Sequence, residues 1–173
     1  MDSEAVAKSV GRIAVAMMAQ IPASEHLALV GIRRGGVDVA KSIIAHLREK
    51  HVREFPLGTV DISLYRDDAA TTLPSPKIGP SHIPFSIEGK DIVLVDDVLH
   101  TGRTVRAAIE CLLDYGRPRR IWLAALCDRG QRELPISPDF VGMTLNVPAG
   151  TQVRARFGAP EGPCVVLRNR VAS

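Results

Sequence analysis

No stretch of this 173-residue chain is apolar over the length that a transmembrane helix needs, so we expect no membrane span. Its first residues include Asp2 and Glu4 and no basic segment ahead of an apolar one, which argues against a secretory signal. Cysteines are few, and Cys111, Cys127 and Cys164 have neither an even count nor a metal-type spacing. We therefore expect reduced core thiols in a cytoplasmic protein.

The composition is that of an ordinary globular domain, with 46% hydrophobic and 24% charged residues. A formal charge of +3 is too small an excess to indicate nucleic-acid binding by itself. Internal repeats, low-complexity tracts and domain linkers are absent from the sequence. We expect residues 1–173 to form a single domain with a substantial core.

The most informative segment joins a strand, two adjacent carboxylates and a polar loop that opens a helix. Residues 92–95 are all apolar, which is typical of a strand covered on both faces. Asp96 and Asp97 follow where that strand is expected to end, and open α/β sheets bind their ligands there. The loop Thr101-Gly102-Arg103-Thr104 then offers a helix N-terminus, which favours a phosphate. This combination suits a ribose 5-phosphate; the alternative is an ordinary turn with a solvated pair of aspartates.

A second loop of the same kind, Arg33-Arg34-Gly35-Gly36, follows an expected strand and precedes an expected helix. Its glycines permit a close backbone approach, and its arginines supply positive charge. Pyrophosphate needs such a site, here through Arg33, Arg34 and Gly35, although a solvated basic turn is the alternative. Further along, Tyr65 and Arg66 begin a long loop that would close over the pyrophosphate as a lid, unless they form only a surface turn.

Strands and helices alternate through the middle of the chain, which predicts an α/β fold with a mostly parallel, twisted sheet flanked by helices. The proline-rich residues 66–87 are expected to form a long flexible loop. Residues 128–147 are expected to form a small hood at the sheet edge that carries Asp96. Helices are expected over residues 3–21, 37–50 and from the 101–104 loop to 115, and strands over 27–31, 59–65, 92–95, 121–127, 142–147, 152–157 and 163–169.

These motifs, in this order, resemble the type I phosphoribosyltransferases. Within them, the chain is similar to the family of bifunctional pyrimidine-operon attenuation regulators and uracil phosphoribosyltransferases. The resemblance implies transfer of ribose 5-phosphate from phosphoribosyl pyrophosphate to uracil, giving UMP and pyrophosphate. It also implies UMP-dependent binding of a pyrimidine-synthesis mRNA leader, and a homodimer or a dimer of dimers. The stretches that carry it are residues 30–33, 61–68, 83–85, 93–106, 116–118 and 128–136.

The resemblance also implies a division of labour among the site residues. Asp96 and Asp97 hold the ribose hydroxyls, and Arg66 acts with them as the third catalytic residue. Mg²⁺ is implied as the cofactor, held mainly by substrate oxygens, with one of the two aspartates reaching it through water. The resemblance assigns the 5-phosphate to Thr101, Gly102, Arg103 and Thr104. It assigns the pyrophosphate to Arg33, Arg34 and Gly35, and contacts with the base to His100, Phe140 and Val141.

Two features depart from the family. His100 stands where this branch usually has Tyr, and it is either a base contact or a spacer in the phosphate loop. Of the family's RNA-contacting positions only Arg132 is retained, so we expect weaker contacts with RNA phosphates. Two alternatives stay open: a nucleotide-sensing RNA-binding attenuator with little catalytic activity, and a purine phosphoribosyltransferase of the same fold. The other positions aligned with RNA-contacting residues of the family hold Gly11, Val15, Ser137 and Met143. An RNA-binding protein needs a contiguous basic face, and the best candidates for one are Arg117, Arg119, Arg120, Arg132, Arg154 and Arg156.

Overall fold

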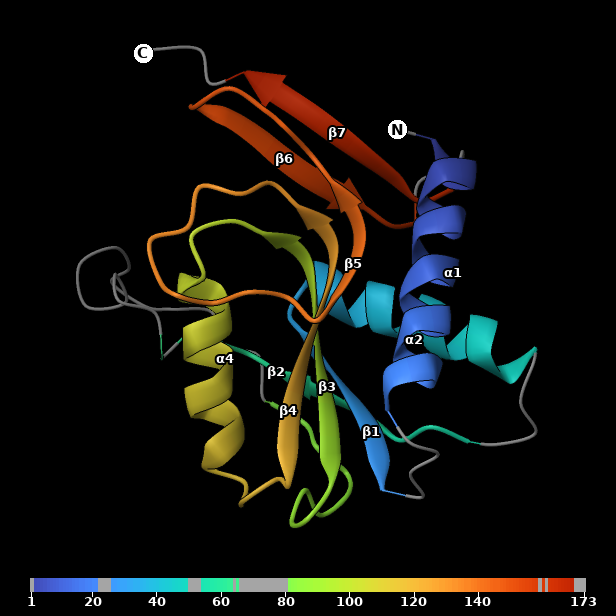
Figure 1. Ribbon diagram of the computed structural model, residues 1–173, viewed down its shortest axis with the longest axis vertical. Coiled ribbons are helices and arrows are strands. Elements are labelled where there is room, and N and C mark those ends of the chain that lie inside the picture. The colour runs from blue at the N-terminus through green and yellow to red at the C-terminus, as the bar shows by residue number, and fades with distance from the viewer. Residues whose placement is uncertain are drawn as a thin grey trace.

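The computed structural model describes residues 2–21, 26–49, 54–63, 65, 81–158, 160 and 162–169. Its centre is a parallel five-stranded sheet in the order β2-β1-β3-β4-β5, with helices on both faces (Figure 1). No helix among the described residues is both long and apolar enough to cross a membrane. The elements are α1 (Ser3–Gln20), β1 (Leu27–Ile32), α2 (Gly35–Arg48), β2 (Leu57–Val60), β3 (Asp91–Leu99), α4 (Arg103–Leu113), β4 (Arg120–Asp128), β5 (Phe140–Thr144) and the antiparallel hairpin of β6 (Thr151–Arg156) and β7 (Cys164–Asn169).

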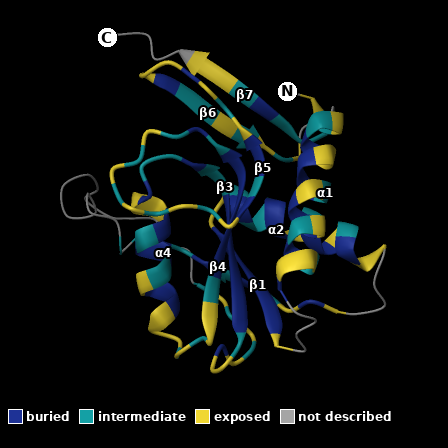
Figure 2. Cartoon of the chain, in the orientation of Figure 1, coloured by how far each residue is buried: buried dark blue, intermediate teal, exposed yellow. Residues whose placement is uncertain are grey.

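The sheet is buried on both faces (Figure 2), which explains the apolar run in β3. Val93 and Val95 belong to the core cluster that α1 and α2 cover. Ile92 and Leu94 belong to the cluster under α4. Because successive side chains of a strand point to opposite faces, a strand between two helix layers must be apolar at every position. The predicted parallel sheet flanked by helices is therefore confirmed.

Several element boundaries differ from the sequence-based expectation. β3 runs four residues beyond Val95, so Asp96 and Asp97 lie within the strand, where Asp96 pairs with Ala125 of β4. The strand expected over residues 59–65 ends instead at Val60. It ends because the next residue, Asp61, turns the chain by accepting a hydrogen bond from the N–H of Ser63 (3.0 Å).

Only part of the loop expected over residues 66–87 lies among the described residues. Residues 81–87 run beside β2, where His82 and Thr59 exchange two backbone hydrogen bonds of 2.8 Å. Ile87, at the end of this segment, is fully buried against the α4 side of the sheet. This portion therefore packs onto the domain, and residues 66–80 fall outside the described part of the chain.

The three cysteines carry free thiols, and two of them are core residues as expected. Cys111 and Cys127 are buried, and Cys164 is half-buried. Burial, with a smaller contribution from the charge of Asp97, raises the pKa of Cys127 to about 12. A thiol that stays protonated at neutral pH is a packing residue, because the thiolate is the reactive form.

Phe140 is also a core residue, so its side chain is not available for the expected contact with the base. Only 1% of its surface is exposed, and its ring lies 5.7 Å from that of Trp122 in the cluster beneath α1. The ring packs against Trp122 of β4 and beneath α1, so it is covered by the core and not open to a ligand. The resemblance had implied a position beside the base, but the packing of α1 decides the role of this side chain.

We expect Phe140→Ala to lower the free energy of unfolding by about 3–5 kcal/mol, because it leaves a cavity in the core. Urea denaturation measures this directly. Leu113→Ala is the matched control, since that side chain is 50% exposed and its loss should change stability by less than about 1 kcal/mol. A Phe140 variant as stable as the control would contradict the core assignment.

Candidate active site

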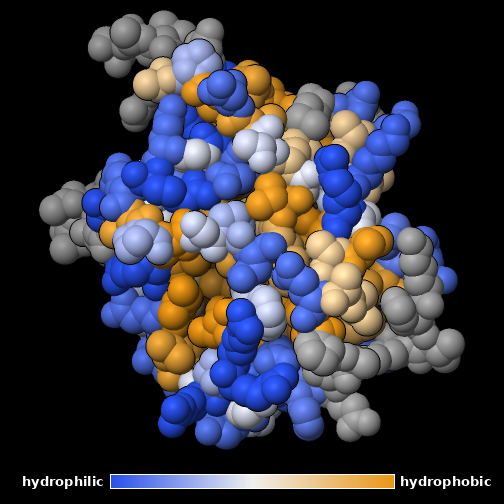
Figure 3. Space-filling model, in the orientation of Figure 1, coloured by the Kyte–Doolittle hydropathy of each residue, from blue (hydrophilic) through white to orange (hydrophobic). Residues whose placement is uncertain are grey.

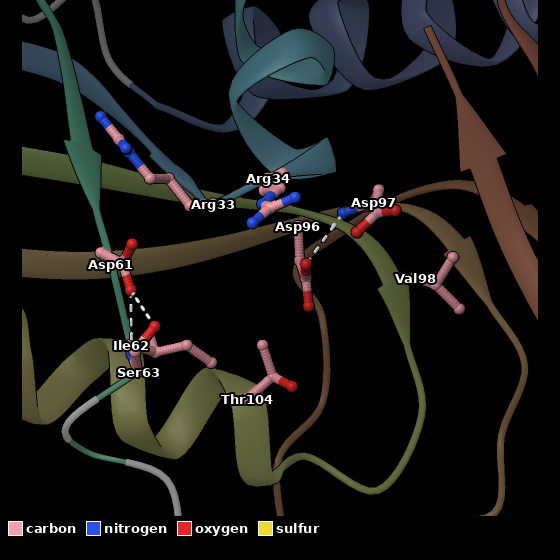
Figure 4. A pocket seen from close by; sticks show the side chains of 9 residues that line it. All are labelled: Arg33, Arg34, Asp61, Ile62, Ser63, Asp96, Asp97, Val98 and Thr104. Carbon is pink, nitrogen blue, oxygen red and sulfur yellow. Dashed lines mark hydrogen bonds between the residues drawn. The ribbon is translucent and has the colours of Figure 1, made fainter. Parts of the chain in front are cut away.

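A cavity of about 280 Å³ opens at the carboxyl ends of β1, β2 and β3. Figure 4 shows the arginine loop after β1, the acidic pair of β3 and the start of α4 facing this opening. The structure thus brings together motifs that lie far apart in the sequence, as the parallel sheet predicts. The lining residues are Arg33, Arg34, Asp61, Ile62, Ser63, Asp96, Asp97, Val98 and Thr104.

The acidic pair is held in an electrostatically unfavourable state. Asp96 is 4% exposed, and its Oδ1 accepts a hydrogen bond from the backbone N–H of Asp97 (2.9 Å). Burial raises the pKa of Asp96 well above its usual range, and the neighbouring charge of Asp97 adds to this. Burial likewise raises the pKa of Asp97, with a further contribution from Asp38. No cation among the described residues pairs with either carboxylate, so a ligand's hydroxyl groups or a cation would relieve them.

The arginine loop lies directly against this pair because two of its residues are glycines. A Cβ on Gly35 would lie 2.4 Å from Oδ2 of Asp97, and one on Gly36 would lie 2.2 Å from the carbonyl oxygen of Val95. Any side chain here would push α2 away from β3. The loop leaves Arg33 and Arg34 exposed at the mouth of the cavity, and the peptide bond between them is cis.

Of the predicted phosphate loop, Thr104 lines the cavity across from the arginine loop (Figure 4), whereas Thr101, Gly102 and Arg103 are not among the lining residues. Gly102 precedes α4 with a φ of 92° and has no side chain to cap the helix. Oγ1 of Thr101 accepts a long hydrogen bond from the N–H of Arg103 (3.4 Å), and the N-terminus of α4 lies beside the cavity where Thr104 lines it. The hood is fastened to this loop, since the carbonyl oxygen of Thr101 accepts hydrogen bonds from the N–H groups of Glu133 and Leu134 (3.0 Å each). Arg103 adds an ion pair with Glu133 at 2.6 Å.

His100 belongs to a hydrogen-bond chain that fixes which of its nitrogens carries the proton. Arg129 can only donate, so the oxygen of the Gln131 amide must face it (3.1 Å), and the amide nitrogen donates to the carbonyl oxygen of Val147 (3.3 Å). That same Gln131 oxygen lies 3.3 Å from Nε2 of His100, which must therefore donate. In neutral His100, Nδ1 is then left as an acceptor. This acceptor fits the role of a base contact, although His100 does not line the cavity described above.

Arg132 has an internal role, which speaks against its expected contact with RNA. Its Nη1 donates to the carbonyl oxygen of His100 (2.8 Å) and its Nε to that of Ile136 (2.9 Å). Its Nη2 pairs with Asp128 at 2.8 Å, and its side chain is only 21% exposed. The guanidinium ties together different parts of the hood and the neighbouring loop. Its nitrogens are all engaged in these contacts, so it has little capacity left to bind an RNA phosphate.

Sequence reasoning missed Asp61 and Ser63 as residues of this cavity. Asp61 directly follows β2, and its carboxylate accepts hydrogen bonds from both the N–H (3.0 Å) and the hydroxyl (2.5 Å) of Ser63. Asp96 was predicted because it follows a buried strand, and the same rule would have predicted Asp61 if the preceding strand had been expected to end at Val60.

Of the expected base contacts, Val141 is half-buried in β5 and does not line the cavity. The expected catalytic Arg66 lies outside the described residues.

The family model for the phosphoribosyl transferase domain matches residues 2–156, and the chain belongs to this family. Solved structures share its type I phosphoribosyltransferase fold. A hypoxanthine-guanine phosphoribosyltransferase from Bacillus anthracis is 18% identical with a TM-score of 0.66, covering 84% of this chain and 82% of that one. A purine phosphoribosyltransferase from Pyrococcus horikoshii is 23% identical with a TM-score of 0.63, covering 84% and 86%. At these identities the likeness establishes the fold alone.

Curated relatives place the chain more narrowly. The bifunctional protein PyrR of Geobacter sulfurreducens is 45% identical over 167 residues, covering 96% of this chain and 94% of the relative. The bifunctional protein PyrR of Thermus thermophilus is 49% identical over 162 residues, covering 94% and 90%. Within the phosphoribosyltransferases, the chain is thus a member of the PyrR family, which confirms the resemblance found from its motifs.

The raised pKa values of the acidic pair predict a stability gain for Asp97→Asn at about pH 7. The folded state holds the carboxyl proton more tightly than the unfolded state, so stability falls as pH rises through the raised pKa. An amide removes this penalty, and the gain should vanish below about pH 4, where an unfolded aspartate is itself protonated.

Urea denaturation of Asp97→Asn and the parent protein, at about pH 7 and about pH 4, measures this difference. Glu54→Gln is the control, because that side chain is 80% exposed and its pair with Arg48 contributes little. A gain of equal size at both pH values would show that the amide acts through packing and not through charge.

Proposed function

We propose that this protein is a uracil phosphoribosyltransferase, which transfers ribose 5-phosphate from phosphoribosyl pyrophosphate to uracil and releases pyrophosphate. The observation that carries the proposal is the convergence of three elements on one cavity: the acidic pair, the arginine–glycine loop and the N-terminus of α4. Each suits a different part of phosphoribosyl pyrophosphate. Membership of the PyrR family and the motif resemblance support uracil as the acceptor.

In this proposal, the ribose lies over β3. Asp96 and Asp97 accept hydrogen bonds from its two hydroxyl groups, which relieves carboxylates that burial destabilises and that pair with no cation among the described residues. The 5-phosphate sits at the N-terminus of α4, against the backbone of the Thr101–Thr104 loop. These contacts hold the anomeric carbon still while the bond to pyrophosphate breaks and the bond to uracil forms.

The leaving pyrophosphate gathers negative charge as the ribose becomes oxocarbenium-like. Arg33 and Arg34 line the cavity and would face that charge, and Gly35 keeps their loop close against Asp97. On the other side, the ionised carboxylate of Asp96 stabilises the positive charge on the ribose. Arg66 is proposed to close over the pyrophosphate, and His100, through Nδ1, to accept a hydrogen bond from an N–H of the base.

The site fits a Mg²⁺ ion whose ligands come mainly from the substrate. The ion would neutralise the negative charge of the pyrophosphate. Among the described residues, no group of three His, Cys, Asp or Glu side chains could hold a metal ion by itself. Asp96 and Asp97 are unneutralised carboxylates, so either can reach the cation through a water molecule. Substrate oxygens would supply most of the coordination, as Mg²⁺ sites in phosphate-transferring proteins often show.

We expect the protein to turn over uracil when it is supplied with phosphoribosyl pyrophosphate and Mg²⁺, and we expect Asp97→Asn to lower kcat/KM at least about 100-fold. Release of pyrophosphate with uracil, hypoxanthine, guanine, adenine and orotate measures both activity and base choice. Glu54→Gln should leave the rate unchanged. Turnover of a purine alone would overturn the pyrimidine assignment, and full activity of Asp97→Asn would overturn the role of the acidic pair.

A second activity, UMP-dependent binding of an mRNA leader, is favoured by one surface. The basic residues that the sequence offers for an RNA surface do not gather in one place. Arg119 and Arg120 lie at the amino end of β4, whereas Arg154 and Arg156 lie on the β6–β7 hairpin at the other end of the molecule (Figure 1). On the hairpin, Arg154, Arg156 and Arg168 share one exposed face, because Gln152 pairs with Arg168 and strand residues alternate. Val153 and Ala155 on the opposite face pack on the core.

This arrangement predicts that the hairpin carries the RNA contacts. The double substitution Arg154→Gln and Arg156→Gln should weaken binding of a pyrimidine-operon leader and reduce the slope of log affinity against log salt by about 2. Filter binding over a salt series, with UMP present, measures the slope. Arg132→Gln should leave it unchanged, and a reduced slope in that variant only would place the RNA on the hood instead.

A further inference from the structure

The hood contains a backbone conformation that residues with a side chain rarely adopt. Gln131 has a φ of 59°, and it is the only non-glycine residue in the described part of the chain with a positive φ. The hood lies between α4 and β5 in Figure 1, and Figure 3 shows hydrophilic residues over much of it. Such a conformation persists only where other contacts hold the residue in place, and it is concentrated at functional sites.

Hydrogen bonds of the side chain hold Gln131 in this conformation. Its amide nitrogen donates to the carbonyl oxygen of Val147 (3.3 Å), and its Oε1 accepts from Nη2 of Arg129 (3.1 Å). The same oxygen lies 3.3 Å from Nε2 of His100. An exposed side chain is therefore ordered by hydrogen bonds at both ends of its amide group.

Arg129 determines which way that amide points. A guanidinium can only donate, so it bonds the oxygen of an amide and never its nitrogen. Arg129 is 8% exposed, its Nη1 donates to the carbonyl oxygen of Thr151 (2.5 Å), and no carboxylate among the described residues pairs with it. A buried cation that loses one of its few acceptors is strongly destabilised. A flipped Gln131 amide, which would turn its nitrogen toward Arg129, is therefore excluded.

The fixed amide gives His100 one defined acceptor. Because the oxygen of Gln131 can only accept, Nε2 carries the proton of the neutral imidazole and Nδ1 keeps a free lone pair. No group in the described part of the chain hydrogen-bonds Nδ1, and the half-buried side chain does not seal this atom from solvent. The backbone of His100 is fixed as well, since its carbonyl oxygen accepts from Nη1 of Arg132 (2.8 Å). The acceptor is thus both oriented and open to a ligand.

We propose that Gln131 is a positioning residue for the base, because it keeps Nδ1 of His100 as the acceptor for a ring N–H of uracil. This inference rests on the uracil transfer proposed above, and it adds a residue that acts through His100 without touching the substrate. Each ring N–H of uracil is a donor, so the Nε2–H tautomer of His100 matches it. The Nδ1–H tautomer would set one donor against another, and the lost hydrogen bond corresponds to about tenfold in affinity.

The tautomer of His100 can be measured without any substrate. We expect long-range ¹H–¹⁵N NMR at about pH 8.5, where an ordinary imidazole is neutral, to show His100 protonated at Nε2. His100→Gln identifies its resonances among the five histidines. Gln131→Met keeps the length of the side chain but removes the amide, so it should lose this preference, whereas Gln131→Glu keeps an oxygen acceptor and should retain it. An Nδ1–H tautomer in the parent protein, or an unchanged tautomer in Gln131→Met, would overturn the proposal.

Uracil kinetics at the same pH, with saturating phosphoribosyl pyrophosphate and Mg²⁺, test whether the reaction uses this acceptor. We expect Gln131→Met to raise KM for uracil about tenfold, with kcat and the KM for phosphoribosyl pyrophosphate nearly unchanged. Gln131→Glu should recover most of the lost affinity for uracil. Ser137→Ala, at another exposed position of the hood, is the matched control and should behave as the parent protein does.

The role of Gln131 and the proposed function fail in different ways. A parent protein that turns over uracil, while Gln131→Met keeps the parent's KM for uracil, would overturn the role of Gln131 alone. An equal rise of both KM values in Gln131→Met would also overturn it, because a distorted hood and not a lost acceptor would be the cause. A parent protein that shows the Nε2–H tautomer but turns over no base would overturn the proposed function, and this inference with it.

Discussion

The close approach of the first turn of α2 to β3 is the constraint on which the active site depends. Side chains at Gly35 and Gly36 would overlap Asp97 and the backbone of Val95, and one at Gly31 would lie 2.6 Å from the Cα of Val37. Because these three residues are glycines, α2 can begin in direct contact with the carboxyl ends of β1 and β3. This proximity sets the arginine loop against the acidic pair and places the two opposite charges on either side of one small cavity.

The same packing gives the site its electrostatic character. An apolar sheet covered on both faces desolvates the end of β3, and desolvation is the main reason that the pKa values of Asp96 and Asp97 rise. The carboxylates destabilise the folded protein and are best relieved by a ligand that brings hydroxyl groups or a cation. Stability and ligand binding thus oppose each other at these two residues, as is common where a site must hold charge away from water.

Much of this could be predicted from the sequence, because the governing rules are local. The apolar residues 92–95 indicated a strand buried on both faces, and the position of Asp96 after that run indicated a ligand edge. The role of Phe140 could not be predicted, since it depends on how α1 packs across the sheet. Arg132 was likewise ambiguous, because only the folded hood shows which carbonyl groups its guanidinium reaches. Asp61 was missed because the β-like pattern after Val60 hid the turn that ends β2.

The hood and the phosphate loop are joined by several hydrogen bonds and so form one mechanical unit. Thr101 accepts from two hood N–H groups, and Arg132 of the hood donates to the carbonyl oxygen of His100. A ligand that orders either segment also orders the other, and linkage requires the effect to be reciprocal. The base end and the phosphate end of a nucleotide would then strengthen each other's binding, so that a whole nucleotide is held more tightly than its separate parts would suggest.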